Sequence, residues 1–139
     1  RVLMSAVTGW FVAQLLKTII HTLMTKKFDP ERLTGSGGMP SSHSSTVCAM
    51  ATASGLLYGL DSFAFAVTVI IAIIVMHDAM GVRLETGKQA KLLNEIVESF
   101  RTMNGKKLAE EKLKEFVGHT PLQVLMGALL GILIGFLMA

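Results

Sequence analysis

Two short polar motifs carry the histidines of this chain that could do chemistry together. The first occupies residues 37–45 and reads Gly-Gly-Met-Pro-Ser-Ser-His-Ser-Ser. Glycines let a backbone approach a ligand closely, and a helix that begins after them offers free N–H groups and a partial positive charge to an anion such as phosphate. Serine hydroxyls add donors, and His43 can exchange a proton near neutral pH. The alternative is a serine-capped helix that follows a flexible loop.

The second motif, Gly-His-Thr-Pro at residues 118–121, places His119 just before another predicted helix. With Lys17, Arg32 and Arg83 as cations, the two histidines would form an anion site that contains an acid and a nucleophile. We predict no metal there, because the sequence has neither a His-Glu-x-x-His motif nor carboxylates at ligand spacing. The lack of a Gly-x-Ser-x-Gly motif argues against acyl transfer through a serine.

Composition sets the environment in which this site must be built. Of the 139 residues, 51% are hydrophobic and 17% are charged, and the mean hydropathy is +0.55. This balance excludes a disordered chain, which needs low hydrophobicity and high charge. A single cysteine excludes a disulfide scaffold and a cysteine-based zinc site. A net charge of +3 with few aromatic residues fits a nucleic-acid-binding domain poorly, so the apolar content indicates a lipid environment.

The apolar residues form runs long enough to cross a bilayer, which takes roughly 20 helical residues. We predict an all-α integral membrane bundle with four transmembrane helices, at about 2–25, 44–60, 62–80 and 121–139. The alternative, a very apolar soluble bundle, would need polar faces that the last two helices lack. The whole chain, 1–139, is predicted to be a single membrane-embedded domain.

One face of the first predicted helix is polar. Gln14, Lys17 and His21 share this face, because they stand at positions i, i+3 and i+7. An ionisable side chain near mid-membrane costs about 2.5–3.5 kcal/mol on insertion scales, so it usually faces a polar cavity or a partner. We expect Lys17 to be a buried cation of the anion site. Snorkelling to the interface is the alternative for Lys17 and the favoured interpretation for His21.

Four helices place the loops at 26–43 and 81–120 on one side of the membrane. Eleven of the 13 Lys and Arg residues lie in these loops, whereas Arg1 lies on the other side and Lys17 lies within a helix. Because positively charged short loops stay in the cytoplasm, we predict that the loops and the active site face the cytoplasm.

The second loop has a pattern of its own. Apolar residues recur at helical spacing over 92–100 and again over 109–117, and polar residues fill the other faces. We predict an amphipathic helical hairpin, inserted at 81–120, that turns at Asn104–Gly105. Its apolar face would pack on the bundle or the membrane interface, with lipid sensing or partner docking as the alternative.

These motifs resemble those of a known superfamily. Pro-Ser-Ser-His at 40–43 resembles the Pro-Ser-Gly-His motif of the type 2 phosphatidic acid phosphatases, a superfamily that includes the vanadium-dependent haloperoxidases. Residues 119–131 resemble its His-x-Pro-x-Asp-Val-x-x-Gly segment. The resemblance is closer to the superfamily's divergent branch of small membrane proteins, through segments that extend over nearly the whole chain, at 14–17, 37–45, 78–83, 87–90 and 118–121.

The resemblance implies a phosphatase that needs no metal or cofactor. In it, His119 would attack phosphorus and form a phosphohistidine, and His43 would protonate the departing alkoxide. Phosphoryl transfer depends mainly on positioning and on neutralising charge at the phosphoryl oxygens. The residues implied for that task are Lys17, Arg32, Arg83, Ser41 and the backbone N–H groups of Gly38 and Ser42.

The spacing of the cations departs from the superfamily pattern. Lys17 and Arg32 are 15 positions apart and Arg83 and His119 are 36 apart, although each pair is close together in the superfamily's motifs. Two lysines lie nearer to His119 in the sequence and could replace Arg83, namely Lys112 and Lys114.

Two substitutions within the motifs also matter. Gln123 replaces the aspartate that orients the nucleophilic histidine, and an amide cannot stabilise an imidazolium as a charge does. We therefore expect a weaker nucleophile, or a site that binds phosphate without turning it over. Ser42 replaces a glycine, which is tolerable only if its φ is negative.

We predict a metal-independent membrane hydrolase that acts on an isoprenoid or glycerolipid phosphate entering from the bilayer. The alternative is a non-catalytic phospholipid-binding or transport protein with the same anion site; a haloperoxidase fits less well, because those enzymes are soluble. Gly127, Gly131 and Gly135 form a stripe that allows close helix packing in lipid. This stripe would face the second helix of the same chain or, as the alternative, a second subunit in a homo-oligomer.

The predicted orientation can be tested with a cysteine placed between residues 105 and 107. In intact cells it should resist an impermeant thiol reagent and become reactive only after the membrane is permeabilised, because the charged loops face the cytoplasm. Ready labelling of intact cells would reverse the orientation.

Overall fold

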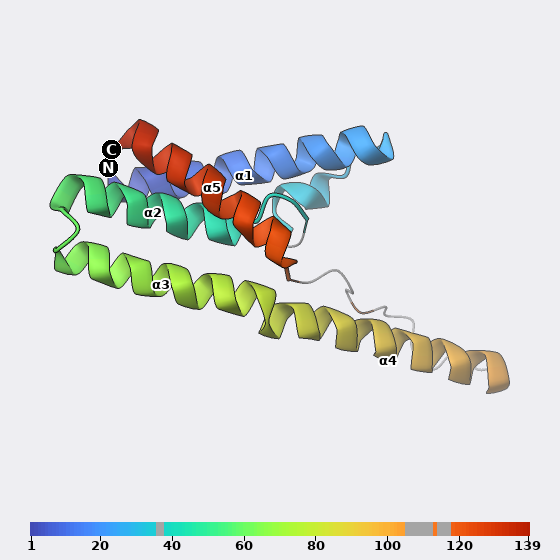
Figure 1. The fold of residues 1–139 in the computed structure, drawn as a ribbon. Helices are drawn as coiled ribbons and strands as arrows, with labels where there is room; N and C mark the ends of the chain where they lie inside the picture. Colours follow the sequence, from blue (N-terminus) through green and yellow to red (C-terminus); the bar gives the residue numbers. More distant parts are fainter. Residues whose placement is uncertain (36–37, 105–112, 114–117) are drawn as a thin grey trace.

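The computed structural model describes residues 1–35, 38–104, 113 and 118–139, and the regular secondary structure of this part of the chain is all helical, with no strand. Figure 1 shows the arrangement. The elements are α1 (Val2–Thr25), η1 (a 3-10 helix, Pro30–Leu33), α2 (Ser42–Tyr58), α3 (Phe63–Met80), α4 (Val82–Asn104) and α5 (Pro121–Met138).

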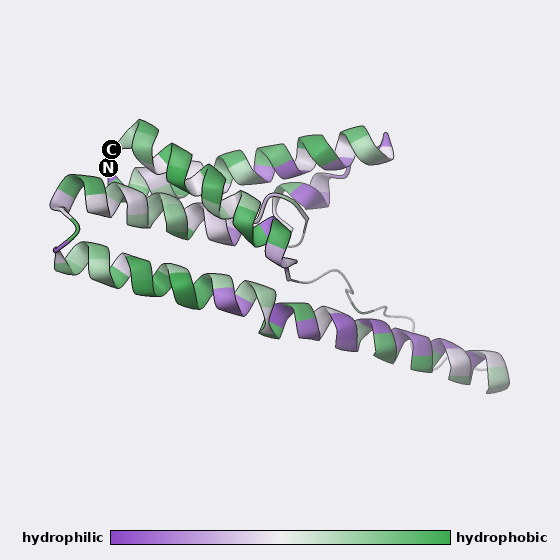
Figure 2. Cartoon of the chain, viewed as in Figure 1, coloured by the Kyte–Doolittle hydropathy of each residue, from purple (hydrophilic) through white to green (hydrophobic). Residues whose placement is uncertain are grey.

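Three helices in the described part of the chain are long and apolar enough to cross a membrane. They are α1, α3 with its continuation to Met103, and α5. In Figure 2 the ribbon is largely hydrophobic along α3 and α5 and largely hydrophilic along α4. Eighteen residues, the length of α3 and of α5, rise about 27 Å, close to the hydrocarbon thickness of roughly 30 Å. α2 has 17 residues and is rich in serine and alanine, so the predicted count of four spans is not confirmed.

α2 lies at the centre of the bundle, and α1, α3 and α5 pack around it (Figure 1). α1 and α3 run antiparallel to α2, whereas α5 runs parallel to it. The start of α2, the start of α5 and the ends of α1 and α3 therefore share one end of the bundle. This arrangement agrees with the prediction that both long loops lie at the same end.

Small residues let the helices around α2 approach it closely. Ser45 Oγ in α2 donates a hydrogen bond to the carbonyl oxygen of Gly9 in α1, at 2.8 Å. On the other side, a Cβ at Gly127 or Gly131 would collide with a backbone carbonyl oxygen of α2, and a Cβ at Gly135 would lie 2.5 Å from Thr52 Cβ. The glycine stripe of α5 is thus used within the chain, as the favoured alternative predicted.

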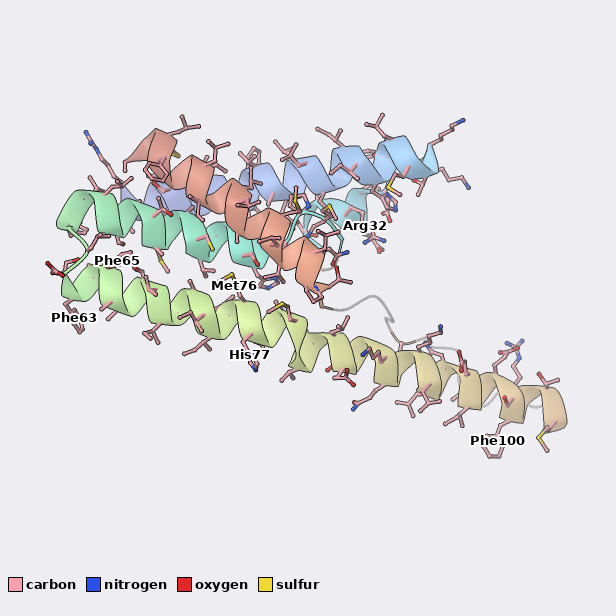
Figure 3. All side chains as sticks on the ribbon, viewed as in Figure 1. Arg32, Phe63, Phe65, Met76, His77 and Phe100 are labelled. Carbon is pink, nitrogen blue, oxygen red and sulfur yellow. The ribbon has the colours of Figure 1, made fainter. Side chains whose placement is uncertain are left out.

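α3 contacts α2 through larger side chains. Figure 3 shows Phe65 and Met76 on the side of α3 that faces α2, whereas Phe63 and His77 point away from the bundle. Met76 Sδ lies 3.8 Å from Cys48 Sγ in α2. The outward face of α3 consists of exposed apolar residues, which suits contact with lipid.

The second long loop differs from the predicted hairpin in one respect. α4 extends α3 almost without interruption, because Gly81 N–H donates to the His77 carbonyl and Glu85 N–H donates to the Gly81 carbonyl, as in a continuous helix. α4 therefore projects beyond the bundle (Figure 1), and its apolar side chains, including Phe100, are exposed rather than packed on the other helices. α4 is described as far as Asn104; the predicted turn at Asn104–Gly105 and the second half of the hairpin reach beyond the described residues and stay predictions.

The contact between α5 and α2 makes a prediction about stability. Gly131→Val should lower the free energy of unfolding by about 1–3 kcal/mol or more, because the new side chain would overlap the backbone of α2. Ile132→Val, at an exposed neighbouring position, is the matched control and should have little effect. Thermal unfolding of both variants in one detergent would compare them, and equal stabilities would contradict this packing.

Candidate active site

Two helix N-termini meet at the end of the bundle that holds the long loops. The backbone N–H of Ser41, which precedes α2, donates to the carbonyl oxygen of Gln123 in the first turn of α5, at 3.1 Å. Each helix is capped by a side chain: Ser41 Oγ accepts from the backbone N–H of Ser44, and Thr120 Oγ1 accepts from that of Gln123. The positive ends of two helix dipoles therefore lie beside each other, which favours an anion between them.

His119 is held against the junction of α3 and α4. Its backbone N–H donates to the carbonyl oxygen of Ala79, at 2.9 Å. Gly118 has φ +87°, and a Cβ there would collide with the backbone at Leu84, so only glycine allows this approach. These contacts bring the start of α4, which carries Arg83, next to His119, although 36 positions separate the two residues in the sequence.

Gln123 determines which nitrogen of His119 carries the proton. Gln123 Oε1 accepts a hydrogen bond from the backbone N–H of Thr120, so this atom is the oxygen of the amide. His119 Nδ1 lies 3.3 Å from the same oxygen and must be the donor. His119 Nε2 then keeps its lone pair; it is buried and makes no hydrogen bond within standard geometry to the described residues, although the backbone of Gly38 lies close enough to act on the ring. The substituted glutamine thus does orient the imidazole as a nucleophile would require.

The surroundings of His119 keep it neutral. Its side chain is fully buried. Burial, reinforced by the positive charge of Lys17, lowers the pKa of His119 to about 4, although the hydrogen bond to Gln123 acts in the opposite direction. A neutral imidazole with a free Nε2 lone pair can attack an electrophile at neutral pH.

The second histidine lies beside the first. The ring centroids of His43 and His119 are 5.7 Å apart, and the rings meet edge to face at 65°. Nε2 of His43 lies 2.9 Å from Nη1 of Arg83, and Arg83 Nε donates to Asp78 Oδ2, also at 2.9 Å. His43 Nδ1 is buried without a hydrogen-bond partner. The structure therefore brings together three of the predicted site residues, His43, Arg83 and His119.

Lys17 supplies the buried cation. Its side chain is only 2% exposed, so snorkelling to the interface, the alternative interpretation, is wrong. Among the described residues its ammonium has no carboxylate partner, and Nζ reaches only the carbonyl oxygen of Gly35, at 3.5 Å. Gln14 Nε2 donates to the same carbonyl, and Gln14 Oε1 is left buried without a partner. His21 is part-buried, and its Nδ1 also lacks a hydrogen bond.

The remaining predicted phosphate-binding residues surround Lys17. Arg32 lies in η1, close enough for its charge to act on the Lys17 ammonium. Gly38 has φ +83°, and a Cβ at this position would lie 3.5 Å from Lys17 Cγ. Ser42 is the first residue of α2 and is not among the described residues with positive φ, so serine is tolerated there. The nearer cations Lys112 and Lys114 lie outside the described residues.

Two contacts in this site were not predicted from the sequence. The Ser41 hydroxyl, predicted to bind phosphate, accepts hydrogen bonds from the N–H and the hydroxyl of Ser44. Asp78 lies in one of the segments that carry the resemblance, but no role was predicted for it. In the structure it forms an ion pair with Arg83. The signal for this ion pair was weak, because side chains five positions apart do not lie on the same face of a regular helix. Their contact depends on the irregular backbone of Gly81 between them, with φ −101° and ψ −92°.

The groups that converge here suit an anion better than a metal ion. Within the described part of the chain, no three His, Cys, Asp or Glu side chains are grouped as a metal site would require. The converging groups are instead Lys17, Arg32 and Arg83, two neutral imidazoles and two helix N-termini. A phosphate would offer acceptors to all the cations and to the unpartnered N–H of His43.

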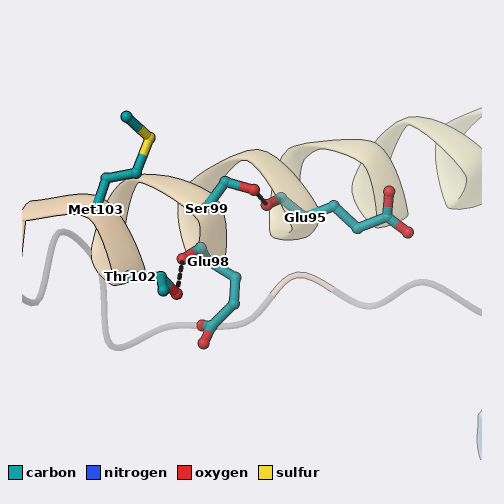
Figure 4. Close-up of a pocket in the computed structure, with 5 residues that line it drawn as sticks. All are labelled: Glu95, Glu98, Ser99, Thr102 and Met103. Atoms are coloured by element: carbon teal, nitrogen blue, oxygen red, sulfur yellow. Dashed lines mark hydrogen bonds between the residues drawn. The ribbon is translucent and has the colours of Figure 1, made fainter.

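A separate hollow lies on the outer part of α4 (Figure 4), and its lining contains none of the cations or histidines of the anion site. Two of its hydroxyls are already bonded to carbonyl oxygens one turn earlier in the helix, and none of its residues belongs to the predicted site. It is lined by Glu95, Glu98, Ser99, Thr102 and Met103.

Comparisons with known proteins agree with the resemblance. The family described as "Divergent PAP2 family" matches residues 1–134. The chain is 41% identical over 146 residues to "Uncharacterized membrane protein YuiD" of Bacillus subtilis (strain 168), in an alignment that covers 99% of this chain and 92% of the relative. No solved structure matches the chain significantly.

The unpaired charge of Lys17 makes a prediction about stability and binding. Lys17→Met should raise the free energy of unfolding by about 1 kcal/mol or more, because a buried cation without a carboxylate is costly and methionine fills a similar volume. The same variant should lose phosphate binding. Lys27→Met, at an exposed position, is the control and should change neither property. Thermal unfolding with and without phosphate measures both, and a less stable Lys17→Met protein would contradict this account.

Proposed function

This chain belongs to the Divergent PAP2 family, and on that premise we propose that it is a membrane phosphatase that hydrolyses a lipid phosphate through a phosphohistidine on His119. The observation that carries the proposal is the buried Nε2 of His119, which makes no hydrogen bond to the described residues. The ring centroids of His119 and His43 are 5.7 Å apart, and the charge of the buried Lys17 acts on His119. An unoccupied nucleophile among cations is what phosphoryl transfer needs.

The reaction would proceed in two steps. In the first, His119 Nε2 attacks phosphorus, the bond from phosphorus to the lipid oxygen breaks, and the lipid oxygen takes a proton from His43 in its imidazolium form. In the second, water attacks the phosphohistidine, His43 accepts a proton from that water, and inorganic phosphate leaves. The sum is lipid phosphate plus water giving lipid alcohol plus phosphate, with both histidines restored. Lys17, Arg32 and Arg83 would neutralise the phosphoryl oxygens in both steps.

The position of the site supports a lipid substrate. The histidines lie at the end of a bundle whose α3 and α5 expose large apolar side chains, such as Ile74 and Leu125. A headgroup at this depth could reach the histidines while its isoprenoid or glycerolipid tail stays beside these helices. In this proposal α2 is the fourth transmembrane helix, shorter than the others because its polar first turns line the site, and the site faces the cytoplasm.

A second candidate, phospholipid binding or transport without turnover, is supported by two observations. Gln123 orients His119 but carries no negative charge to stabilise an imidazolium. Arg83 occupies the Nε2 atom of His43, so the acid is not free in the structure. Saturable binding of phosphorylated lipids without phosphate release would favour this candidate, and a trapped phosphohistidine would exclude it.

Phosphate release from prenyl and glyceryl lipid phosphates tests the phosphatase directly. The purified full chain should release phosphate without added metal, and vanadate should inhibit it. His119→Ala should reduce the rate to background, whereas His43→Ala should lower it by about 10²–10⁴-fold, the usual contribution of a general acid. His77→Ala is the matched control, because His77 points away from the bundle (Figure 3). Full activity of His119→Ala would exclude this mechanism.

A further inference from the structure

The contact between Arg83 and His43 conflicts with the acid role of His43 in the proposed reaction. Arg83 Nη1 lies 2.9 Å from His43 Nε2. A guanidinium group has five N–H donors and no acceptor, and it stays protonated in proteins. His43 Nε2 must therefore be the acceptor, which leaves the ring neutral with its proton on Nδ1.

Arg83 is fixed in this position from its other side. Its Nε donates to Asp78 Oδ2 at 2.9 Å, an ion pair that joins the last turn of α3 to the first turn of α4. The same junction receives the backbone of His119 at Ala79. Asp78 thus sets the direction in which the guanidinium points, although no contact between Asp78 and either histidine is described.

A histidine held in this way cannot protonate a leaving group. The acid form is the imidazolium, which carries a proton on both nitrogens, and two N–H donors cannot face each other at hydrogen-bond distance. Loss of the Nδ1 proton from the neutral ring would leave an imidazolate, far too basic to form here. His43 can become an acid only after Arg83 Nη1 has left its Nε2 atom.

We propose that the Asp78–Arg83 pair holds His43 in the neutral Nδ1–H form, and that a bound phosphate releases this hold by taking the Arg83 N–H groups onto its own oxygens. The proposal rests on the phosphatase function proposed above and deepens it. Asp78 is a positioning residue in this scheme, and Arg83 has two roles, one in the resting site and one around the substrate.

The charges around His43 explain why a phosphate would act as the trigger. Lys17 from α1, Arg83 from α4, Asp78 from α3 and His119 before α5 are the titratable and charged groups that act on or contact it. Without an anion, a protonated His43 would stand beside two cations and one carboxylate. A phosphate dianion would reverse this balance, and arginine pairs with phosphate in bidentate, charge-assisted hydrogen bonds. The Arg83 side chain is 43% exposed, so it has room to move.

The consequence is a site that acquires its acid only when substrate is present. The proton on His43 Nε2 would be taken up from solvent after phosphate binds, and it would then pass to the departing lipid oxygen.

The test is the protonation state of His43, read by ¹⁵N–¹H NMR of the full chain labelled on histidine and held in lipid nanodiscs at pH 7. A spectrum of His43→Gln assigns the signal among the four histidines. Without phosphate, His43 should show the Nδ1–H tautomer, although free imidazole prefers Nε2–H. Saturating inorganic phosphate should protonate both nitrogens, whereas chloride at equal ionic strength should not.

Two variants distinguish the effect of the Asp78–Arg83 pair on the tautomer of His43 from a general effect on packing. Arg83→Met should return His43 to the Nε2–H tautomer, and Lys88→Met, which removes another cation of α4 that is paired with Glu85, should not. Asp78→Asn should lower the ratio of Nδ1–H to Nε2–H by about two- to fivefold, the range that a half-exposed ion pair supports. Glu85→Gln is its control and should leave the ratio unchanged.

The outcomes are distinguishable from those of the phosphatase assay. The proposal that Arg83 keeps His43 in the Nδ1–H tautomer would be overturned by either of two results. One is an Nε2–H tautomer of His43 in the absence of phosphate; the other is the same tautomer in Arg83→Met as in the unsubstituted chain. The absence of phosphate release from every lipid phosphate, together with the expected tautomers, would overturn the phosphatase and leave the hold of Arg83 on His43 standing.

Discussion

The close approach of α5 to α2 is the constraint on which the rest of the structure depends. Glycines at 127, 131 and 135 remove the side chains that would separate the two backbones, and the Ser41 N–H bonds directly to the Gln123 carbonyl at the end of this contact. Two parallel helices that touch in this way must also begin side by side. Their starts carry His43 and His119, so backbone packing within the bundle determines the spacing of the two imidazoles.

The site that results is polar, buried and incompletely paired. Within the described part of the chain, His119 Nε2, His43 Nδ1 and Gln14 Oε1 are buried atoms without hydrogen bonds, and Lys17 is a buried cation without a carboxylate. Each such group costs free energy that a fold optimised only for stability would avoid. An oxyanion would pair the cations and the His43 N–H, which is the physical reason to regard this end of the bundle as a binding site.

The replacement of an aspartate by Gln123 illustrates what a sequence comparison can and cannot decide. The sequence showed that Gln123 carries no charge to stabilise an imidazolium. It did not show that the amide oxygen that accepts from His119 also completes the cap of α5 through the Thr120 N–H. That second bond fixes the orientation of the amide and therefore the tautomer of His119. Gln123 therefore orients the imidazole as the aspartate would, but without a negative charge. The hydrogen bond within the helix cap fixes the amide in the way that an ion pair would otherwise do.

The sequence by itself determined the helices, the lipid environment and the residue types of the site, because hydrophobic runs, helix caps and motif spacing are local properties. It located the break between the second and third helices, which the structure places between Tyr58 and Phe63, and the two histidine motifs at helix starts. Only the tertiary structure decided that Gly118 lies on the α3–α4 junction, that Arg83 reaches His43 and that α4 projects beyond the bundle. The first two of these contacts join residues 34 to 40 positions apart, and no local pattern specifies how far one helix slides along another before their side chains meet.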